Sequence, residues 1–350
     1  MSKYLYPYRW YLKDSYPPKN GLNVFGTFIC GGGSTMGYKL AGYNHLGGVE
    51  IDKQVADVYN TNHKPKYLYN EDIREFNKRT DLPKELYELD ILDGSPPCST
   101  FSMAGSREKA WGKEKQFREG QAVQTLDDLV FVYCDTIIKL QPKVFLLENV
   151  KGIIQGNAKV YSKNIVKKMT EAGYTVQVFC LNAASMGVPQ KRERVFFIGF
   201  KNELKFTKLK LEFNEKAITF GELKTNENDN PFTEFDLNMW NKRQFGEMDF
   251  GATFKRLENR ETNWNSKYIY DNNTCQTITS TSGSKLISYS EPRHLNNNEL
   301  KQCGTYPLDY NFKKIEPKYL IGMSVPPVMT AQIANQIKIQ WLNKINSKGV

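Results

Sequence analysis

One cysteine in this sequence stands where its thiol could do chemistry. Cys98 follows two prolines in GSPPCSTFS, just after the apolar run LDILDGS. The prolines fix φ on the approach, so the thiol loses little conformational freedom when it reacts. Reaction needs the thiolate, and a nearby cation or helix N-terminus would lower the thiol pKa. A nucleophile is one interpretation of Cys98, and a buried structural cysteine is the other.

Three further side chains could assist such a nucleophile. Glu148 ends the apolar run KVFLLEN, where scarce water would raise the carboxyl pKa and make it a proton donor. Arg192 and Arg194 are two residues apart in QKRERVFFIGF. On one strand they would point to the same face and could clamp an oxygen or orient a carboxylate. The alternatives are a solvated glutamate at a strand end and two surface arginines.

A glycine-rich turn offers a site for a cofactor. The segment FICGGGSTMG is followed, 17 residues after Gly33, by Glu50 in GGVEID. Glycines let the backbone approach a ligand, and an acid that ends the next strand can accept hydrogen bonds from ribose hydroxyls. Asp72 and Ile73 would follow a further strand, where an adenine could be met. A dinucleotide or an adenosyl group fits equally well, and a purely structural turn stays open.

The pattern of apolar runs predicts the elements that position these residues. From residue 22 to 203 short apolar runs alternate with helical spacing, which favours a doubly wound, Rossmann-like α/β fold with a mostly parallel sheet. The expected strands are NVFGTFI, LGGVEID, LDILDGS, KVFLLEN, YTVQVFCLN and RVFFIGF. Helices are expected in 125–140 and in 160–173 up to Gly173. A further helix is expected near the C-terminus, where Ile333, Ile337, Trp341 and Ile345 share one face.

Changes in amino-acid composition and in the pattern of apolar residues divide the chain into four parts. An aromatic arm (1–21) precedes the α/β lobe (22–203), and a second, smaller and irregular lobe (204–290) precedes a return segment (291–350). Residues 201–290 hold 13 basic and 13 acidic side chains. A ligand of this lobe would therefore be recognised by amides, hydroxyls and aromatic rings. The arm is expected to pack on the core, with a stacking platform for nucleic acid as the alternative.

The composition limits the partners. Lys and Arg exceed Asp and Glu by 48 to 38, which favours a polyanion such as nucleic acid, although a merely basic surface is the alternative. The six cysteines are at least 28 residues apart, so no metal site is expected. No signal peptide or membrane-spanning run is apparent, and a cytoplasmic protein with reduced thiols and no membrane partner is expected.

These motifs, in this order, resemble those of the C5-cytosine DNA methyltransferases. The order runs from the glycine-rich turn and Glu50 through Pro-Pro-Cys, Glu-Asn-Val and Gln-x-Arg-x-Arg to GMSVPP near the end, and it covers about 22–203 and 291–345. The resemblance implies methyl transfer from S-adenosylmethionine to carbon 5 of a flipped cytosine in duplex DNA. It also implies a covalent Cys98 adduct at carbon 6, and it makes 204–290 the target-recognition domain.

The resemblance assigns a role to each matching residue. The cofactor-binding residues would be Phe28, Gly32, Gly33, Glu50, Asp72, Ile73, Pro96, Ser324 and Val325. The catalytic residues would be Cys98, Glu148, Arg192 and Arg194. Within that set, Glu148 would act at ring nitrogen 3 and Arg192 would hold the cytosine carbonyl oxygen. The substrate-binding residues would be Ser102, Asn149 and Gln190.

Departures from the family pattern keep other functions open. Cys30 and Met323 stand where the family usually has glycine and asparagine, and Ser99 stands where glutamine is common. Cys30 and Met323 motivate a non-catalytic DNA-binding or regulatory protein as the alternative, whereas Ser99 is a tolerated variant. A tRNA cytosine-5 methyltransferase is a close variant, although a separate recognition lobe favours DNA. A nicotinamide-dependent oxidoreductase would leave Cys98 unexplained. The expected partner is duplex DNA, with a cognate restriction endonuclease as a further candidate, and the chain is expected to be a monomer.

Overall fold

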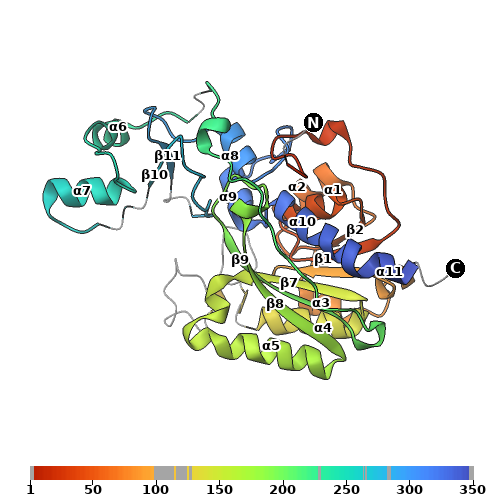
Figure 1. The fold of residues 1–350 in the computed structure, drawn as a ribbon. Coiled ribbons are helices and arrows are strands. Elements are labelled where there is room, and N and C mark those ends of the chain that lie inside the picture. The colour runs from red at the N-terminus through yellow and green to blue at the C-terminus, as the bar shows by residue number, and fades with distance from the viewer. Residues whose placement is uncertain are drawn as a thin grey trace. The chain divides into compact units, whose positions relative to one another are not determined.

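A computed structural model (Figure 1) describes residues 4–97, 114–115, 124–125, 128–227, 230–262, 264, 266–281 and 285–346. Cys98 and Ser102 lie outside these residues. The chain divides into two compact units. We call 16–182, 193–212 and 330–350 the sheet unit, and 1–15, 183–192 and 213–329 the mixed unit. None of the described helices is long and apolar enough to cross a lipid bilayer.

Seven strands in the order β3-β2-β1-β4-β7-β9-β8 form the sheet of the sheet unit. Their bounds are β1 (Asn23–Thr27), β2 (Asn44–Val49), β3 (Tyr67–Tyr69), β4 (Ile91–Gly94), β7 (Val144–Val150), β8 (Tyr174–Asn182) and β9 (Glu193–Lys201). Neighbours from β3 to β7 are parallel, whereas β9 is antiparallel to both β7 and β8. The predicted, mostly parallel fold is confirmed, and all six expected strands are present. The further strand expected before Asp72 is β3, whose bounds were not predicted because three residues are too few to show a pattern.

Helices cover both faces of this sheet. Their bounds are α1 (Gly33–Leu40), α2 (Lys53–His63), α3 (Ile73–Lys78), α4 (Leu129–Leu140), α5 (Lys159–Glu171), α10 (Pro327–Ile337) and α11 (Asn343–Asn346). In Figure 1, α4 and α5 cover one face and α1, α2 and α10 cover the other. Side chains alternate along each strand. Phe25, Leu92 and Phe145 accordingly share a core with Tyr133 of α4 and Ile165 of α5.

Two predicted helices end as their sequences indicate. In α4, Leu129, Tyr133 and Ile137 are buried at helical spacing, as expected. The helix α5 ends at Glu171, and Gly173 follows with a positive φ of 87°, a conformation that glycine adopts without strain. Both predictions are therefore confirmed. A short antiparallel pair, β5 (Glu114–Lys115) and β6 (Gln124–Thr125), lies between β4 and α4 in the chain.

The C-terminal helix has the predicted apolar face but is not one regular helix. Ile333, Ile337 and Trp341 are all fully buried, whereas Ile345 of α11 is only half-buried. After α10 the helix widens into a π-helix, Lys338–Leu342, before α11. The Trp341 indole stacks on Phe206 at 5.6 Å between ring centroids and donates a hydrogen bond to the carbonyl of Thr207 (2.8 Å). The widened turn coincides with this anchored indole.

The mixed unit is more regular than predicted. It contains α6 (Glu234–Asn241), α7 (Phe250–Glu258), α8 (Asn297–Cys303), α9 (Pro317–Met323) and a parallel pair, β10 (Lys267–Ile269) and β11 (Leu286–Ser288). A small core of Met239, Phe250, Tyr268 and Ile287 holds α6, α7 and the two strands together. Side-chain caps mark the starts of both helices, from Thr233 for α6 and from Asp249 for α7. These capping residues are visible in the sequence and indicate helices, although 204–290 was predicted to be irregular.

The unit boundaries also differ from the predicted ones. Residues 291–329 were expected to complete the α/β lobe but cluster with the mixed unit, and only 330–350 join the sheet unit. Within the mixed unit the aromatic arm is anchored by Trp10, whose indole donates to the carbonyl of Thr305 (2.9 Å). The backbone amides of Leu12 and Lys13 bind the Asp309 carboxylate at 2.7 and 3.1 Å.

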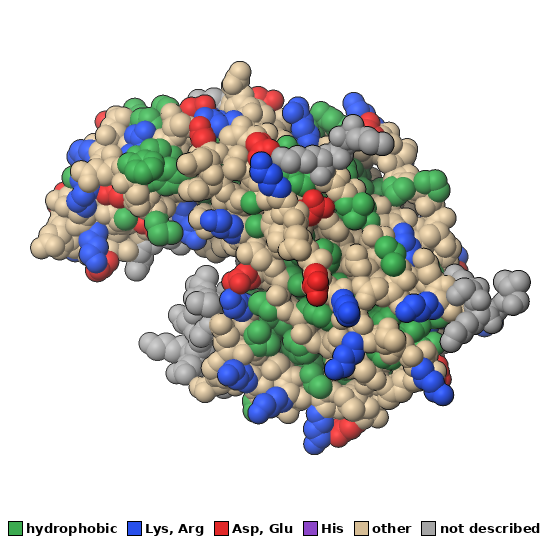
Figure 2. Space-filling view, in the orientation of Figure 1, with side chains coloured by type: hydrophobic (Ala, Val, Ile, Leu, Met, Phe, Trp, Pro, Cys, Tyr) green, Lys and Arg blue, Asp and Glu red, His purple; other side chains and the backbone are tan. Residues whose placement is uncertain are grey.

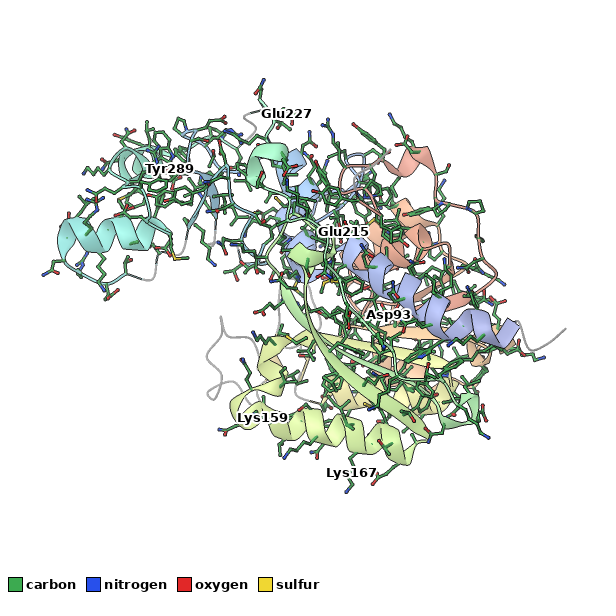
Figure 3. All side chains as sticks on the ribbon, viewed as in Figure 1. Asp93, Lys159, Lys167, Glu215, Glu227 and Tyr289 are labelled. Carbon is green, nitrogen blue, oxygen red and sulfur yellow. The ribbon has the colours of Figure 1, made fainter. Side chains whose placement is uncertain are left out.

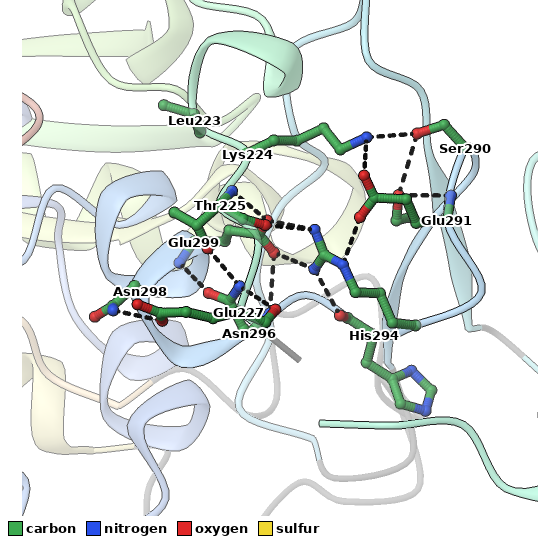
Figure 4. A network of polar contacts seen from close by, with 12 residues as sticks. Leu223, Lys224, Thr225, Glu227, Ser290, Glu291, His294, Asn296, Asn298 and Glu299 are labelled. Carbon is green, nitrogen blue, oxygen red and sulfur yellow. Dashed lines mark hydrogen bonds and ion pairs between the residues drawn. The ribbon is translucent and has the colours of Figure 1, made fainter. Parts of the chain in front are cut away.

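A buried ion pair explains why α8 stays with the mixed unit (Figure 4). Both terminal nitrogens of Arg293 donate to the Glu299 carboxylate at 2.8 Å, and both side chains are almost completely buried. Glu299 also accepts from the backbone amides of Thr225 and Asn296. Burying the two charges costs free energy that only this set of hydrogen bonds offsets. The loop that contains Thr225 is thereby tied to α8.

We predict that Glu299→Ala lowers the free energy of unfolding by about 3–5 kcal/mol, because it leaves a buried guanidinium without its main partner. Urea unfolding of the full chain would measure this. Glu75→Ala is the matched control: it removes an exposed partner of Lys78 and should cost less than about 1 kcal/mol. Equal effects from the two variants would contradict the role given to the Arg293 and Glu299 pair.

Candidate active site

The predicted site residues follow the strands of the sheet unit in the order of the sheet. Asp72 follows β3, Glu50 follows β2, Phe28 follows β1, Pro96 follows β4, and Glu148 is two residues from the end of β7. Because parallel strands end at the same edge, these five residues lie along one edge of the sheet. Along this edge, the residue predicted to bind adenine comes first, the residue predicted to bind ribose comes second, and the residue predicted to bind the reacting base comes last.

The turn after β1 has a backbone that favours glycine. Gly32 is left-handed (φ 76°) and caps the start of α1. A Cβ on Gly32 would collide with the imidazole of His63, so a larger residue would displace that ring. Phe28 (φ 54°) and Cys30 (φ 47°) are also left-handed, which costs non-glycine residues about 1–3 kcal/mol each. Cys30 therefore has a conformation that glycine adopts without strain, and has it at a cost.

Glu50 holds this turn to the next strand. One carboxylate oxygen accepts the backbone amide of Cys30 (3.0 Å), and the other accepts that of Asp52 (2.9 Å). Burial raises the pKa of Glu50 to about 7, although the backbone hydrogen bonds oppose the rise. A carboxylate oxygen has a second lone pair, so both oxygens could still accept a ribose hydroxyl. This set of acceptors fits the predicted role of Glu50.

The segment after β3 is fixed by a helix cap. The Asp72 side chain accepts the backbone amide of Arg74 (2.8 Å) at the start of α3 and pairs with the Arg74 guanidinium (3.2 Å). Ile73, the first residue of α3, is buried. Pro96 is buried after β4. The structure thus gives the positions of Asp72, Ile73 and Pro96. Their contacts with a cofactor stay predictions.

Glu148 and Arg194 form an ion pair at this edge. The Arg194 Nε lies 3.0 Å from a Glu148 carboxylate oxygen, and the two side chains are 15% and 11% exposed. Arg194 is the second residue of β9, and because β9 is antiparallel to β7 its first residues lie at the end of β7. The neighbouring Asn149 is buried, and its amide nitrogen has no hydrogen-bond partner within the described residues. Successive side chains of a strand point to opposite faces of the sheet, so Glu148 and Arg194 share a face and Asn149 lies on the other one.

Arg192 does not share this face, contrary to the prediction. Arg192 precedes β9, which begins at Glu193, and belongs to the mixed unit. Its guanidinium is buried and donates to the carbonyls of Ile278 (3.1 Å), Gly322 (3.0 Å) and Ser324 (2.9 Å). The prediction failed because it assumed that one strand carries both arginines. The contacts give Arg192 a structural role in joining three segments.

Gln190 is likewise committed to the main chain. Its amide oxygen accepts from the backbone of Ile278 (3.1 Å), and its amide nitrogen donates to the carbonyl of Cys303 (3.1 Å). These contacts do not support the predicted role in substrate binding. In the same unit Ser324 is buried with its hydroxyl accepting from Tyr306 (2.7 Å), and Val325 is buried. Their predicted contacts with the cofactor are not tested by these bonds.

Asp93 is a buried carboxyl that the analysis of the sequence did not select (Figure 3). It lies on β4 and accepts the hydroxyl of Tyr38 on α1 (3.1 Å), and its carbonyl accepts the hydroxyl of Thr27 on β1 (3.3 Å). Burial raises the pKa of Asp93 to about 7, and the nearby Glu148 adds to the rise. The available signal was Asp93 directly after the apolar pair Ile91 and Leu92 in LDILDGS, which also contains Asp90. Asp93 links the helix after the glycine turn to the strand that leads to Cys98.

Comparisons with known proteins agree with this geometry. A family model described as C-5 cytosine-specific DNA methylase matches residues 22–339. The chain is 34% identical over 196 residues to the type II methyltransferase M.FnuDI of Fusobacterium nucleatum, covering 55% of this chain and 51% of that protein. The chain thus spans about half the length of that relative.

Two further similarities extend over most of the chain. It is 27% identical over 336 residues to the type II methyltransferase M1.HphI of Haemophilus parahaemolyticus, covering 90% of this chain and 86% of that protein. The crystal structure of a Spodoptera frugiperda DNMT2 variant superposes with a TM-score of 0.65 at 16% identity, covering 91% and 99% of the two chains. At that identity the superposition supports the fold alone.

We predict that Asp93→Asn removes part of the pH dependence of stability. The folded state retains the Asp93 proton up to a pH of about 7, whereas the unfolded chain releases it near about 4. The contribution of Asp93 is therefore fully present below pH ~4 and falls by about 1.4 kcal/mol per unit as the pH rises toward 7.

Urea midpoints of the wild type and of Asp93→Asn, compared from acid to neutral pH, would measure this difference. The advantage of the wild type over the variant should shrink as the pH rises. Asp57→Asn, at an exposed position on α2, is the control and should change little. A difference between wild type and Asp93→Asn that does not vary with pH would contradict the prediction.

Proposed function

The chain belongs to the C-5 cytosine-specific DNA methylase family, and we propose that it methylates carbon 5 of a flipped cytosine in double-stranded DNA. The observation that carries the proposal is the Glu148 and Arg194 pair at the edge of the sheet. Ring nitrogen 3 and the carbonyl oxygen of cytosine are adjacent hydrogen-bond acceptors. A protonated Glu148 donates to the nitrogen, and Arg194 donates to the oxygen. Arg194 takes the role that the sequence gave to Arg192, whose terminal nitrogens already bind carbonyls.

Cys98 is the proposed nucleophile, on the strength of the family motif. Carbon 5 of cytosine reacts poorly with an electrophile until the ring becomes enamine-like. The Cys98 thiolate adds to carbon 6, which forms a carbon–sulfur bond, while Glu148 donates its proton to nitrogen 3 and relieves the charge developing on the ring. Carbon 5 then takes the methyl group and leaves the sulfonium of the donor as a neutral thioether. A base removes the carbon 5 proton, the carbon–sulfur bond breaks so that Cys98 leaves as a thiolate, and nitrogen 3 returns its proton to Glu148.

The residues along the sheet edge fit S-adenosylmethionine as the methyl donor. When bound, that cofactor supplies an electrophilic methyl group on a sulfonium. Glu50 keeps lone pairs for ribose hydroxyls, and Gly32 has no side chain to block the turn. The residues proposed to hold the cofactor are Phe28, Gly32, Gly33, Glu50, Asp72, Ile73, Pro96, Ser324 and Val325.

The proposed reaction requires the base to leave the duplex. The pair formed by Glu148 and Arg194 is largely buried, so a stacked and paired cytosine cannot reach it. Flipping the nucleotide costs a few kcal/mol. Asn149 and Ser102 are carried forward from the family motif as contacts with the extruded nucleotide.

The proposed partners follow from the same family. Duplex DNA is the substrate, the net charge of +10 favours a polyanion, and the chain acts as a monomer. M.FnuDI and M1.HphI are type II methyltransferases; in such a setting a restriction endonuclease would accompany this chain in the cytoplasm of a bacterial or phage-infected cell.

Bisulfite sequencing of DNA from cells that express the protein would test the function. We expect cytosines within one short sequence to resist conversion when the wild type is present. The same sites should convert fully with Cys98→Ala, because a methyl group cannot replace the thiolate at carbon 6. Full conversion of every cytosine with the wild type, or protection that survives in Cys98→Ala, would contradict the proposal.

The two arginines of the motif should respond differently to truncation. We predict that Arg194→Ala lowers kcat by about 10²–10³-fold, the usual loss of one electrostatic donor. Its effect on the urea midpoint should be smaller than that of Arg192→Ala, because Glu148 can take up a proton once its cation is gone. Arg192→Ala should instead lower the free energy of unfolding by about 2–4 kcal/mol, because three carbonyls lose a charged donor. Methyl transfer measured at saturating DNA, beside urea unfolding, separates the two effects. The reverse pattern would return the oxygen contact to Arg192.

A further inference from the structure

A pocket of ≈ 270 Å³ lies in the mixed unit, between the turn before α7 and the segment after β10. Phe245 and Met248 line one side and are 84% and 67% exposed. Asn272, Asn273 and Gln276 also line it. We propose that this pocket takes a nucleobase that flanks the target cytosine and so helps to select the DNA sequence. The proposal rests on the function proposed above and names the surface that would read the DNA.

The aromatic side of the pocket is held rigidly. The Tyr270 hydroxyl accepts the backbone amide of Gly246 (3.0 Å) and donates to the carbonyl of Glu247 (2.8 Å), which fixes the turn that carries Phe245. The Tyr270 ring stacks on Tyr289 with centroids 4.2 Å apart (Tyr289 is labelled in Figure 3). The Phe245 ring lies edge-on to Tyr270 at 5.5 Å. A ring held in place loses little entropy when a base stacks on it.

A cation supports the same platform from behind. The Arg243 guanidinium lies 3.3 Å from the centroid of Trp240 and 4.6 Å from that of Tyr289. Its nitrogens donate to the carbonyls of Tyr289 (3.1 Å) and Trp240 (2.7 Å). Arg243 is thus committed to the protein, and Phe245 is left as the exposed ring of the assembly.

The amide side of the pocket can read the edge of a base. Within the described part of the chain, the side chains of Asn272, Asn273 and Gln276 make no hydrogen bond, whereas the backbone of Asn273 binds the backbones of Tyr270 and Phe220. Side-chain amides held on a fixed backbone present a donor and an acceptor, the pattern that recognises base edges.

The charges of the lining disfavour a phosphate as the ligand. Lys267 and Asp249 are the charged residues of the lining, and Asp249 is used to cap α7 through the amide of Ala252 (2.8 Å). A phosphate site would need a surplus of cations. An exposed aromatic ring beside neutral amides instead matches a base, which has an apolar face and a polar edge.

Other exposed apolar side chains of this unit lie outside the pocket. Figure 2 shows hydrophobic side chains among charged ones on the surface over α6 and α7. Those with large exposed fractions are Phe235, Leu237, Leu257 and Trp264. Phe235 and Trp264 contact each other at 4.9 Å between ring centroids, but a protein partner would need a larger continuous apolar patch. The mixture of amides and one exposed ring therefore favours DNA over a protein as the occupant.

Selection from a library of random duplexes would test the proposal without requiring catalysis. Full-length wild type, Phe245→Ala and Asn272→Ala would each be incubated with the library, and the bound DNA sequenced. We expect the wild type to enrich one motif. Phe245→Ala should bind that duplex about tenfold more weakly, equal to about 1.4 kcal/mol, and Asn272→Ala should relax the preference at one position of the motif.

Two variants in the same unit provide matched controls. Leu257→Ala and Asn238→Ala alter exposed side chains of α7 and α6 outside the pocket and should keep both affinity and motif. The altered pocket residues are themselves exposed, so their truncation should not unfold the chain, and equal urea midpoints would confirm this.

The proposal fails if both pocket variants retain the wild-type affinity and motif, or if the wild type enriches no motif. It also fails if the variants keep DNA binding but lose an association with protein, since the pocket would then serve a protein partner. If the wild type enriches a DNA motif but transfers no methyl group to it, the proposed reaction is wrong, whereas the proposal that the pocket reads a base is still supported.

Discussion

The direction of β9 is the constraint on which the candidate site depends. Parallel strands from β3 to β7 bring the residues that follow them to one edge of the sheet. Because β9 is antiparallel to β7, its first residues reach that same edge. Arg194 at the start of one strand therefore meets Glu148 near the end of the other. A parallel β9 would have placed the guanidinium at the opposite edge of the sheet.

Carboxyl groups along this edge are stabilised in different ways. Glu148 has a cation, Glu50 has two backbone amides, and Asp93 has the hydroxyl of Tyr38. A carboxyl without a cation tends to keep its proton when buried, and burial raises the pKa of both Glu50 and Asp93 to about 7. Glu50 and Asp93 therefore need not both be ionised near neutral pH, which lowers the number of negative charges along this edge of the sheet. That reduction suits a site whose nucleophile must be an anion.

The sequence predicted local features better than the division of the chain. Apolar runs such as KVFLLEN were sufficient to locate strands, and Gly173 was sufficient to locate the end of a helix, because burial and backbone strain act over a few residues. The two arginines of one motif were assigned together, yet Arg192 joins three segments of the mixed unit while Arg194 joins the sheet. Which carbonyls would meet Arg192 depends on Ile278 and Gly322, about 90 and 130 residues away, and no local pattern encodes that. Asp93 was visible as an acid directly after an apolar pair, but its partner Tyr38 was not.

The central claim is that one thiolate adds to a cytosine held by Glu148 and Arg194. Among the described cysteines, Cys134, Cys275 and Cys303 are buried, and burial raises the pKa of Cys134 to about 12, whereas Cys180 is exposed. The most direct measurement is mass spectrometry of the protein trapped on duplex DNA that contains 5-fluorocytosine, from which the final elimination cannot proceed. The account predicts a covalent adduct on the peptide that contains Cys98. No adduct, or an adduct on the exposed Cys180, would contradict it.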